Sequence, residues 1–241
     1  MGFYEQISKY YDYIFPIGAE QIRFIKEVAG TPPKAVLDIA CGTGGYSLEL
    51  TKQGYEVTAT DLDAEMVHQL KIKAEDTKQN IKSIQANMLD LESKISNKFD
   101  LVFCIGNSIV HLQNLFQIRS FICSAKNLLN NDGSLILQII NFDRVLQKDI
   151  KSLPTISDER IALSFERNYC YSKQENTIYF KTRLSVDGKT FENEIPLFPL
   201  LEEDLTQAVT DAGFKQVKLF GDFAGNDFDK YNSYMLVLWA K

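Results

Sequence analysis

The stretch VLDIACGTGG, Val36 to Gly45, constrains the fold of this chain more than any other feature. Apolar residues around a single Asp lead into three glycines packed around one Thr, which is typical of a buried strand that turns directly into a helix. Gly42, Gly44 and Gly45 have no Cβ, so the backbone can take tight-turn angles and a ligand can approach main-chain atoms. The stretch therefore predicts an α/β fold with a nucleotide-like ligand at this turn.

A carboxylate further along the chain supports this ligand class. The segment YEVTATD alternates and ends at Asp61, nineteen residues beyond Gly42, and a carboxylate at the end of a second strand can accept both ribose hydroxyls. The alternative is that Asp61 or Asp63 caps the next helix. We predict that Asp63 is the cap and Asp61 the ribose acceptor. A dinucleotide is disfavoured, because Ser47 stands where the GxGxxG pattern needs its third Gly.

Strand and helix patterns alternate over the first part of the chain. We expect helices over residues 3–15 and 18–29, and strands over 35–39, 55–60, 83–86, 99–104 and 134–140. A long helix before the last strand carries an apolar face and ends at residues 130–133; that face consists of Leu112, Leu115, Phe116, Ile122 and Leu129. This spacing predicts right-handed crossovers and a parallel sheet.

The pattern changes after Asn141. Residues 161–197 read as antiparallel strands, followed by a helix over 202–212 and closing strands over 216–220 and 234–240. We therefore expect a Rossmann-like, doubly wound, seven-stranded, mostly parallel α/β sheet with an inserted antiparallel β subdomain. The expected division is a ligand-binding domain, 1–145 and 199–241, and an inserted cap over the active site, 146–198.

The glycine turn with Asp38 resembles the first motif of class I S-adenosylmethionine (SAM)-dependent methyltransferases. The segment IQANMLDL, Ile84 to Leu91, resembles their adenine segment, which implies that Asn87 holds the ring through its side-chain oxygen and Met88 stacks on it. Asn87 could instead cap a short helix. The cofactor residues that the resemblance implies are Tyr11, Asp38, Ala40, Gly42, Gly44, Asp61, Leu62, Met66, Asn87, Met88 and Cys104.

Two further segments narrow the resemblance to the glycine/sarcosine N-methyltransferase branch. LVFCIGNSIVHL, Leu101 to Leu112, is similar to a run in which the Asn and His face the substrate, here Asn107 and His111. His111 could equally be a partly buried polar group. IINFDRVL, Ile139 to Leu146, matches an RNYD-like run, but Ile140 replaces the Arg that pairs with an amino-acid carboxylate. Arg144 or Arg167 could compensate. The implied substrate residues are Asn107, His111, Asn141 and Arg144.

The aromatic run KYYDYIF, Lys9 to Phe15, precedes the first strand. Related enzymes use such a segment as a lid, which implies that Tyr11, with Tyr10 next, reaches the cofactor; aromatic residues at helical spacing can also be core. His111 and Tyr11 are the candidates for catalysis, and no residue declares itself a base. Tyrosines in the insertion could line the pocket or only join strands: Tyr169, Tyr171 and Tyr179.

Composition limits the partners. The net charge of −6 and the pI near 5.1 argue against nucleic acid, which needs a concentrated basic surface. The four cysteines lack metal-ligand spacing, so we expect buried thiols in a reducing cytoplasm and no metal. The N-terminal residues carry scattered charges and no long apolar run, so we expect no membrane span. A cytoplasmic monomer or homodimer is the expected state.

These observations predict a SAM-dependent methyltransferase that acts on a small-molecule N or O nucleophile by in-line displacement. The alternative is a SAM- or nucleoside-binding sensor without turnover. A nicotinamide-dependent oxidoreductase is disfavoured by Ser47. Base methylation of nucleic acid is disfavoured because the fourth strand ends in CIGN rather than in an Asn/Asp-Pro-Pro-aromatic run.

Overall fold

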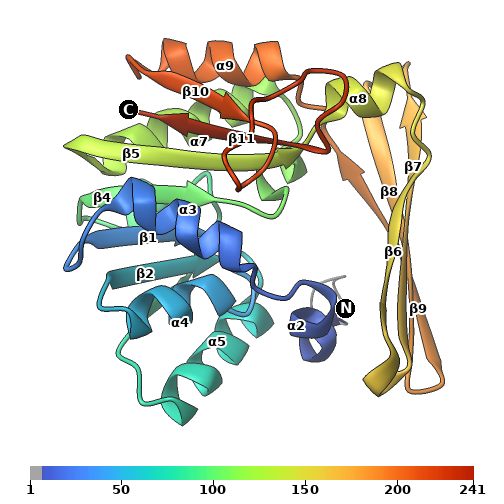
Figure 1. Cartoon of the computed structure of the whole chain (residues 1–241), viewed down its shortest axis with the longest axis horizontal. Coiled ribbons are helices and arrows are strands. Elements are labelled where there is room, and N and C mark those ends of the chain that lie inside the picture. Colours follow the sequence, from blue (N-terminus) through green and yellow to red (C-terminus); the bar gives the residue numbers. More distant parts are fainter. Residues whose placement is uncertain (1–6) are drawn as a thin grey trace.

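The computed structural model describes residues 7–241, which form two sheets and their flanking helices (Figure 1). Sheet A has the strand order β10-β11-β5-β4-β1-β2-β3, and sheet B has the order β6-β7-β8-β9. The strands are β1 (Ala35–Ile39), β2 (Glu56–Asp61), β3 (Lys82–Gln85), β4 (Phe99–Cys104), β5 (Leu129–Ile140), β6 (Ser152–Asp158), β7 (Leu163–Ser172), β8 (Thr177–Val186), β9 (Lys189–Leu197), β10 (Val217–Phe220) and β11 (Met235–Ala240). The helices are η1 (Ser8–Tyr10), α2 (Tyr11–Ile14), α3 (Ala19–Ala29), α4 (Gly45–Lys52), α5 (Ala64–Asp76), α6 (Leu91–Lys94), η2 (Ser108–His111), α7 (Leu115–Leu128), α8 (Phe142–Gln147), η3 (Glu159–Ile161) and α9 (Glu202–Asp211).

Sheet A confirms the predicted seven-stranded, mostly parallel fold. Strands β1 to β5 pair in parallel, whereas β11 runs antiparallel to β5 and β10 antiparallel to β11. Neighbouring residues of β1 serve opposite faces, since Val36 packs in the cluster of α3 and Leu37 in that of α7. A central parallel strand must be apolar on both sides for this reason. Helices α3 and α4 cover one face of sheet A, and α7 and α9 cover the other (Figure 1).

Residues 130–133, predicted to end the long helix, belong to strand β5 instead. Helix α7 ends at Leu128, but residues 130–133 remain within β5 as a bulge opposite Asp100, between the pairs Phe99↔Leu129 and Leu101↔Ser134. Asn130 Nδ2 donates to Asp100 Oδ1 over 3.1 Å, which holds the bulge against β4.

The apolar face of α7 also differs from the expected one. Phe116 was placed on that face, yet its side chain is 80% exposed. The helix begins at Leu115, after the cap Asn114, so Ile118 and Phe121 face the core. Phe116 lies two positions before Ile118, and residues two apart point to different sides of a helix.

The N-terminal helix is shorter than predicted. Residues 3–6 of the expected range lie outside the described residues, and the rest forms the turn η1 and the short helix α2. Ile14 of α2 packs against Phe165 and Leu184 of sheet B. Helix α2 therefore lies between the two sheets (Figure 1).

Sheet B stands across the carboxyl ends of the parallel strands (Figure 1). Its strands are antiparallel, and β6 was not among the strands expected. Pro154 interrupts the alternation of β6, and the β6–β7 register shifts between Leu153 and Ile156. Alternate residues of sheet B, among them Phe165, Tyr169 and Leu197, are buried toward the rest of the chain, and we call this side the inner face.

Candidate active site

A cavity of about 910 Å³ lies between the carboxyl edge of sheet A, helix α2 and the inner face of sheet B. Binding pockets for small molecules have volumes of roughly 300–1,000 Å³. Its sheet A wall comes from the loops after β1, β2, β3 and β4 and from the ends of β5 and β11, and its opposite wall comes from sheet B. Carboxyl ends of parallel strands are where α/β proteins bind ligands.

The glycine turn forms the floor of the cavity. Gly42 has φ +56°, and a Cβ there would lie 2.8 Å from the ring of Tyr11, so only Gly fits. Gly44 caps α4 with φ +79° and packs against Leu70, away from the cavity wall. Ala40 lines the cavity with φ 58°, a conformation that residues with a Cβ rarely adopt.

Asp38 is the most buried carboxyl group of the cavity wall. It is 3% exposed, and Ser47 Oγ donates to its Oδ2 over 2.6 Å. Burial raises the pKa of Asp38 to about 7 from its ordinary value of 3.8. Ser47, which breaks the dinucleotide pattern, thus holds this carboxyl group in place.

Asp63 takes the capping role that the sequence predicts, and Asp61 lies at the cavity. Asp63 is the N-cap of α5, since its Oδ1 accepts from the amides of Glu65 (2.9 Å) and Met66 (3.3 Å). Asp61 lines the cavity, and its two oxygens accept from the amides of Gly42 (2.8 Å) and Asp63 (2.9 Å). Burial raises the pKa of Asp61. Each carboxylate oxygen keeps a second lone pair for a ligand hydroxyl.

The predicted adenine segment also reaches the cavity. Asn87 and Met88 line it, together with Leu62 and Met66. Asn87 Oδ1 accepts from the amide of Leu89 over 2.9 Å, so this oxygen forms a turn. The N-cap of the following helix α6 is Asp90. The side-chain amide of Asn87 is thereby fixed in orientation beside the cavity.

Asn107 and Gln138 connect the ends of β4 and β5. Asn107, with φ 68°, lines the cavity, and its Oδ1 accepts from the amide of Ile140 over 2.9 Å. Gln138 Oε1 accepts from the amide of Gly106 over 2.7 Å. Gln138 was not among the predicted site residues. A polar side chain within the apolar run LILQII could have indicated it. Both side-chain oxygens are engaged, which leaves the amide NH₂ groups as the donors for a ligand.

His111 lies at the end of η2 and lines the same cavity. Burial lowers the pKa of His111 to about 4, so the imidazole is neutral at physiological pH. Such a weakly basic imidazole can accept a hydrogen bond but holds a proton poorly. The environment therefore favours a positioning role for His111 over a role as general base.

Helix α2 closes the cavity over the glycine turn. Tyr11 lines the cavity, and neighbouring Asp12 accepts from Thr43 Oγ1 over 2.5 Å and from Lys73 Nζ. Tyr10 instead turns away, where its hydroxyl donates to Asp187 over 2.8 Å. Asp12 was not among the predicted site residues, because its partners Thr43 and Lys73 are distant along the chain.

Besides Gly44, three residues predicted to bind the cofactor or the substrate do not reach the cavity. Cys104 is fully buried at the end of β4, and the next residue, Ile105, lines the cavity instead. Asn141 caps α8, and its Nδ2 donates to the carbonyls of Lys230 and Ser233, both over 2.9 Å. Arg144 stacks on the ring of Tyr234, 5.6 Å from its centroid. The turn of α8 after β5 carries both residues away from the cavity.

The sheet B wall is mainly apolar and aromatic. Its cavity-lining residues are Leu153, Arg167, Tyr169, Phe180 and Leu197. Tyr179 is on the outer face, and Tyr171, at the end of β7, does not line the cavity; their hydroxyls donate to Glu175 (2.7 Å) and Asn176 (3.1 Å). Of the three tyrosines named from the sequence, only Tyr169 faces the cavity.

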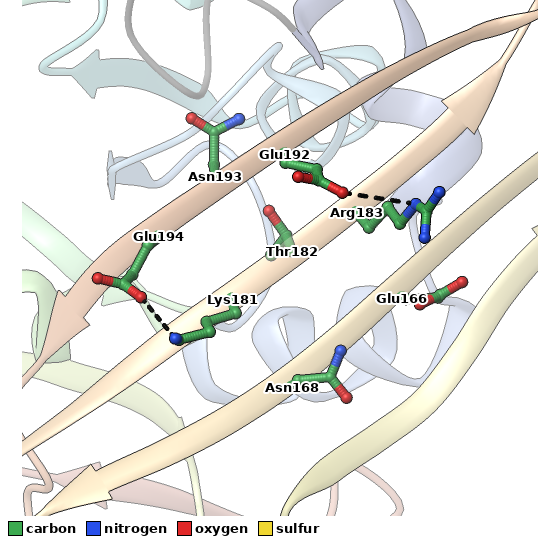
Figure 2. A pocket seen from close by; sticks show the side chains of 8 residues that line it. All are labelled: Glu166, Asn168, Lys181, Thr182, Arg183, Glu192, Asn193 and Glu194. Carbon is green, nitrogen blue, oxygen red and sulfur yellow. Dashed lines mark ion pairs between the residues drawn. The ribbon is translucent and has the colours of Figure 1, made fainter.

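The outer face of sheet B has a shallow hollow of about 490 Å³ with charged walls (Figure 2). Lys181 pairs with Glu194 (3.0 Å) and Arg183 with Glu192 (3.7 Å), and both pairs are shown as dashed lines in Figure 2. Cations and carboxylates thus neutralise one another on this face.

Two expectations from composition fare differently. Cys104 is buried and Cys41 half-buried, but Cys123 and Cys170 are exposed, which corrects the expectation of four buried thiols. Across residues 7–241, no helix combines the length and the apolar character needed to cross a bilayer.

Comparisons with known proteins agree with this geometry. The family model described as a methyltransferase domain matches residues 36–133. The glycine/sarcosine N-methyltransferase of Parasynechococcus marenigrum is 28% identical over 231 residues, covering 90% of this chain and 74% of that protein. That of Aphanothece halophytica is 27% identical, covering 92% and 82%. A solved S-adenosylmethionine-dependent methyltransferase from Clostridium acetobutylicum superposes with TM-score 0.82 at 18% identity, covering 100% and 99%.

Proposed function

This chain is a class I SAM-dependent methyltransferase, and we propose that it methylates a nitrogen or oxygen atom of a small molecule held between sheets A and B. The observation that carries the proposal is the cavity of about 910 Å³ bounded by the glycine turn and Asp61 on one side and by sheet B on the other. Such a volume suits a nucleoside-sized cofactor and a small acceptor. The relatives named glycine/sarcosine N-methyltransferases support a small acceptor.

The residues of the sheet A wall fit SAM. Asp38 and Asp61 give this wall one buried and one half-buried carboxyl group, which suit a ligand with positive charge. Asp61 retains lone pairs for ribose hydroxyls, and Asn87 and Met88 offer a polar edge and an apolar face for adenine. SAM, when bound, supplies an electrophilic methyl group on a sulfonium centre that is a good leaving group.

The remaining task of the chain is to align the acceptor and exclude water. Orientation of two bound reactants can contribute roughly 7–11 kcal/mol. Asn107 and Gln138 offer amide donors beside the ends of β4 and β5, and neutral His111 lines the cavity at the end of η2. Tyr11 of α2 packs over Gly42 of the glycine turn. We propose residues 146–198 as the acceptor cap and residues 1–145 and 199–241 as the cofactor domain.

Calorimetry with SAM tests the first half of the proposal. The wild-type chain should release heat with SAM and with S-adenosylhomocysteine (SAH), and Asp61→Ala should bind both more weakly. Incubation with SAM and a panel of small amines and alcohols, with SAH formation as readout, tests the second half. Absence of SAM binding by the folded wild-type chain would overturn the proposal.

A further inference from the structure

The sheet B wall carries one positive charge that no carboxylate neutralises. Arg167 of β7 is the only Arg or Lys among the described residues that line the cavity. Its Nη2 donates to the carbonyl of Pro154 over 2.6 Å, its Nε is buried without a hydrogen-bond partner, and it forms no ion pair within residues 7–241. A buried cationic donor without a partner is costly, so a ligand that pairs with it binds well.

Two phenols also line the cavity, Tyr169 of β7 on the same strand as Arg167 and Tyr234 directly before β11 of sheet A. Neither hydroxyl has a hydrogen-bond partner within residues 7–241. Tyr169 is close enough to both Tyr234 and Arg167 to be influenced electrostatically by each, and burial raises the pKa of its phenol. Tyr169 therefore remains an O–H donor at neutral pH.

The carboxylates of the cavity lie elsewhere. Asp12, Asp38, Asp61 and Asp63, the lining acids in the described chain, belong to α2, to the carboxyl ends of β1 and β2, or to the residue before α5. The sheet B wall with Arg167 is instead lined by the apolar side chains Leu153, Phe180 and Leu197, with Ile140 at the end of β5, and the ring of Phe180 lies 5.6 Å from that of Tyr169. This end of the cavity thus offers hydrogen-bond donors and a cation within an apolar wall.

Resting on the proposed function, we propose that Arg167, Tyr169 and Tyr234 bind an oxyanion of the methyl acceptor, a carboxylate or a phosphate monoester. The acceptor carries an apolar body that fills the space beside Phe180 and Leu197. Arg167 is then the residue that selects anionic acceptors, and Ile140, which replaces the branch's Arg, contributes to the apolar wall.

The position of the guanidinium is fixed before a ligand arrives. The carbonyl that accepts from Arg167 belongs to Pro154, inside the register shift of β6. Bulges of this kind commonly redirect groups beside active sites. On the outer face of the same sheet, Arg183 pairs with Glu192. Arg183 of sheet B thus has a carboxylate partner, whereas Arg167 has none within residues 7–241.

The test uses three ligands that each carry a phenyl ring as the apolar body. Wild-type protein, with and without SAH, is titrated by calorimetry with 3-phenylpropionate, phenyl phosphate and the neutral 3-phenylpropanol. We expect at least one of the two anions to bind about tenfold more tightly than the alcohol. The anion that binds more tightly shows whether the acceptor carries a carboxylate or a phosphate. Arg167→Met should abolish the preference, Arg167→Lys should retain part of it, and Tyr169→Phe should reduce it severalfold.

Arg183→Met is the matched control, because it removes a cation from the outer face of the same sheet. It should leave the anion preference unchanged, and thermal melts should show that each variant is folded. Equal binding of alcohol and anions by the wild type, or an equal loss in Arg183→Met, would overturn the inference. SAH binding with no anion preference defeats this inference alone, whereas loss of SAH binding defeats the proposed function. The titrations without SAH decide the anion question in either case.

Discussion

Gly42 donates its backbone amide hydrogen to Oδ2 of Asp61 over 2.8 Å. The bond joins the glycine turn after β1 to the carboxyl end of β2, so that two predicted cofactor contacts form one unit. The same carboxylate accepts from the amide of Asp63 at the start of α5. Its position is thus set by main-chain groups of two different loops.

Replacement of Asp61 should weaken the affinity for SAM. Hydrogen bonds to charged groups contribute about 1.5–3 kcal/mol, so we expect Asp61→Ala to raise the Kd about 10- to 100-fold. Asp63→Ala is the control, because Asp63 caps α5; it should lower the free energy of unfolding by about 1 kcal/mol and change the Kd less. Calorimetry and urea denaturation separate the two effects, and equal Kd values for both variants would contradict the assignment.

A Cβ at position 42 should disturb the turn through Tyr11. Gly42→Ala places a methyl group 2.8 Å from the Tyr11 ring on a backbone with φ +56°, so we expect lower stability and weaker SAM binding. Combined with Tyr11→Ala, the substitution should cost less stability than the sum of the two single changes, because the clash is gone. Strict additivity in denaturation experiments would show that the ring is not the obstacle.

The raised pKa of Asp38 predicts a pH-dependent stability. The folded chain keeps a proton on Asp38 up to about pH 7, whereas the unfolded chain loses it near pH 3.8. This group's stabilising contribution is therefore complete below about pH 3.8 and declines as pH rises toward 7, by up to about 1.4 kcal/mol per pH unit. Urea denaturation across this range should show the wild type losing free energy of unfolding relative to Asp38→Asn as the pH rises. Parallel curves would refute the shift.

Ionisation of the same carboxyl group should govern affinity for a cationic ligand. Below about pH 7 Asp38 is largely protonated, so we expect the wild-type affinity for SAM to rise as pH increases through this value. Asp38→Asn should lack this component. Calorimetric titrations with SAM at pH 6 and pH 8 measure it, and an identical pH dependence in both proteins would rule it out.

His111 should remain neutral throughout the physiological range. Burial lowers its pKa to about 4, so its NMR ring signals should not titrate between pH 5.5 and 8. His111→Asn should then lower kcat/KM about tenfold, through one lost hydrogen bond of about 1–1.5 kcal/mol, without changing the pH profile. A profile whose acid limb disappears in this variant would instead identify His111 as the base.

Local sequence signals were sufficient for the parallel core. Strand β4 coincides with its predicted range, and Asp63 caps α5 as expected, because an apolar run and an Asx cap depend on near neighbours. Strand β6 was missed, since Pro154 breaks its alternation and only pairing with β7 reveals it. Phe116 shows the same limit, because its exposure depends on where α7 begins.

For the candidate site, too, features that depend on near neighbours could be predicted and those that depend on distant segments could not. Asp38, Asp61 and Asn107 line the cavity because each lies at or near the carboxyl end of a parallel strand, and that edge can be predicted from the order of the motifs. Asn141 and Arg144 left the cavity because α8 turns away directly after β5. The link from Asp12 to Lys73 could not be foreseen, since it joins segments far apart in sequence.

The two walls of the cavity are distributed very differently along the gene product. On the sheet A wall, Asp38, Asp61 and Asp63 come from the ends of β1 and β2 and from the residue before α5, whereas the sheet B wall is one uninterrupted stretch from β6 to β9. Under the proposed function, substitutions in this stretch, or an exchange of the whole stretch, would change which acceptor is methylated while the residues proposed to bind SAM keep their sequence. Selection for a new acceptor and selection for SAM would then act on different parts of this chain.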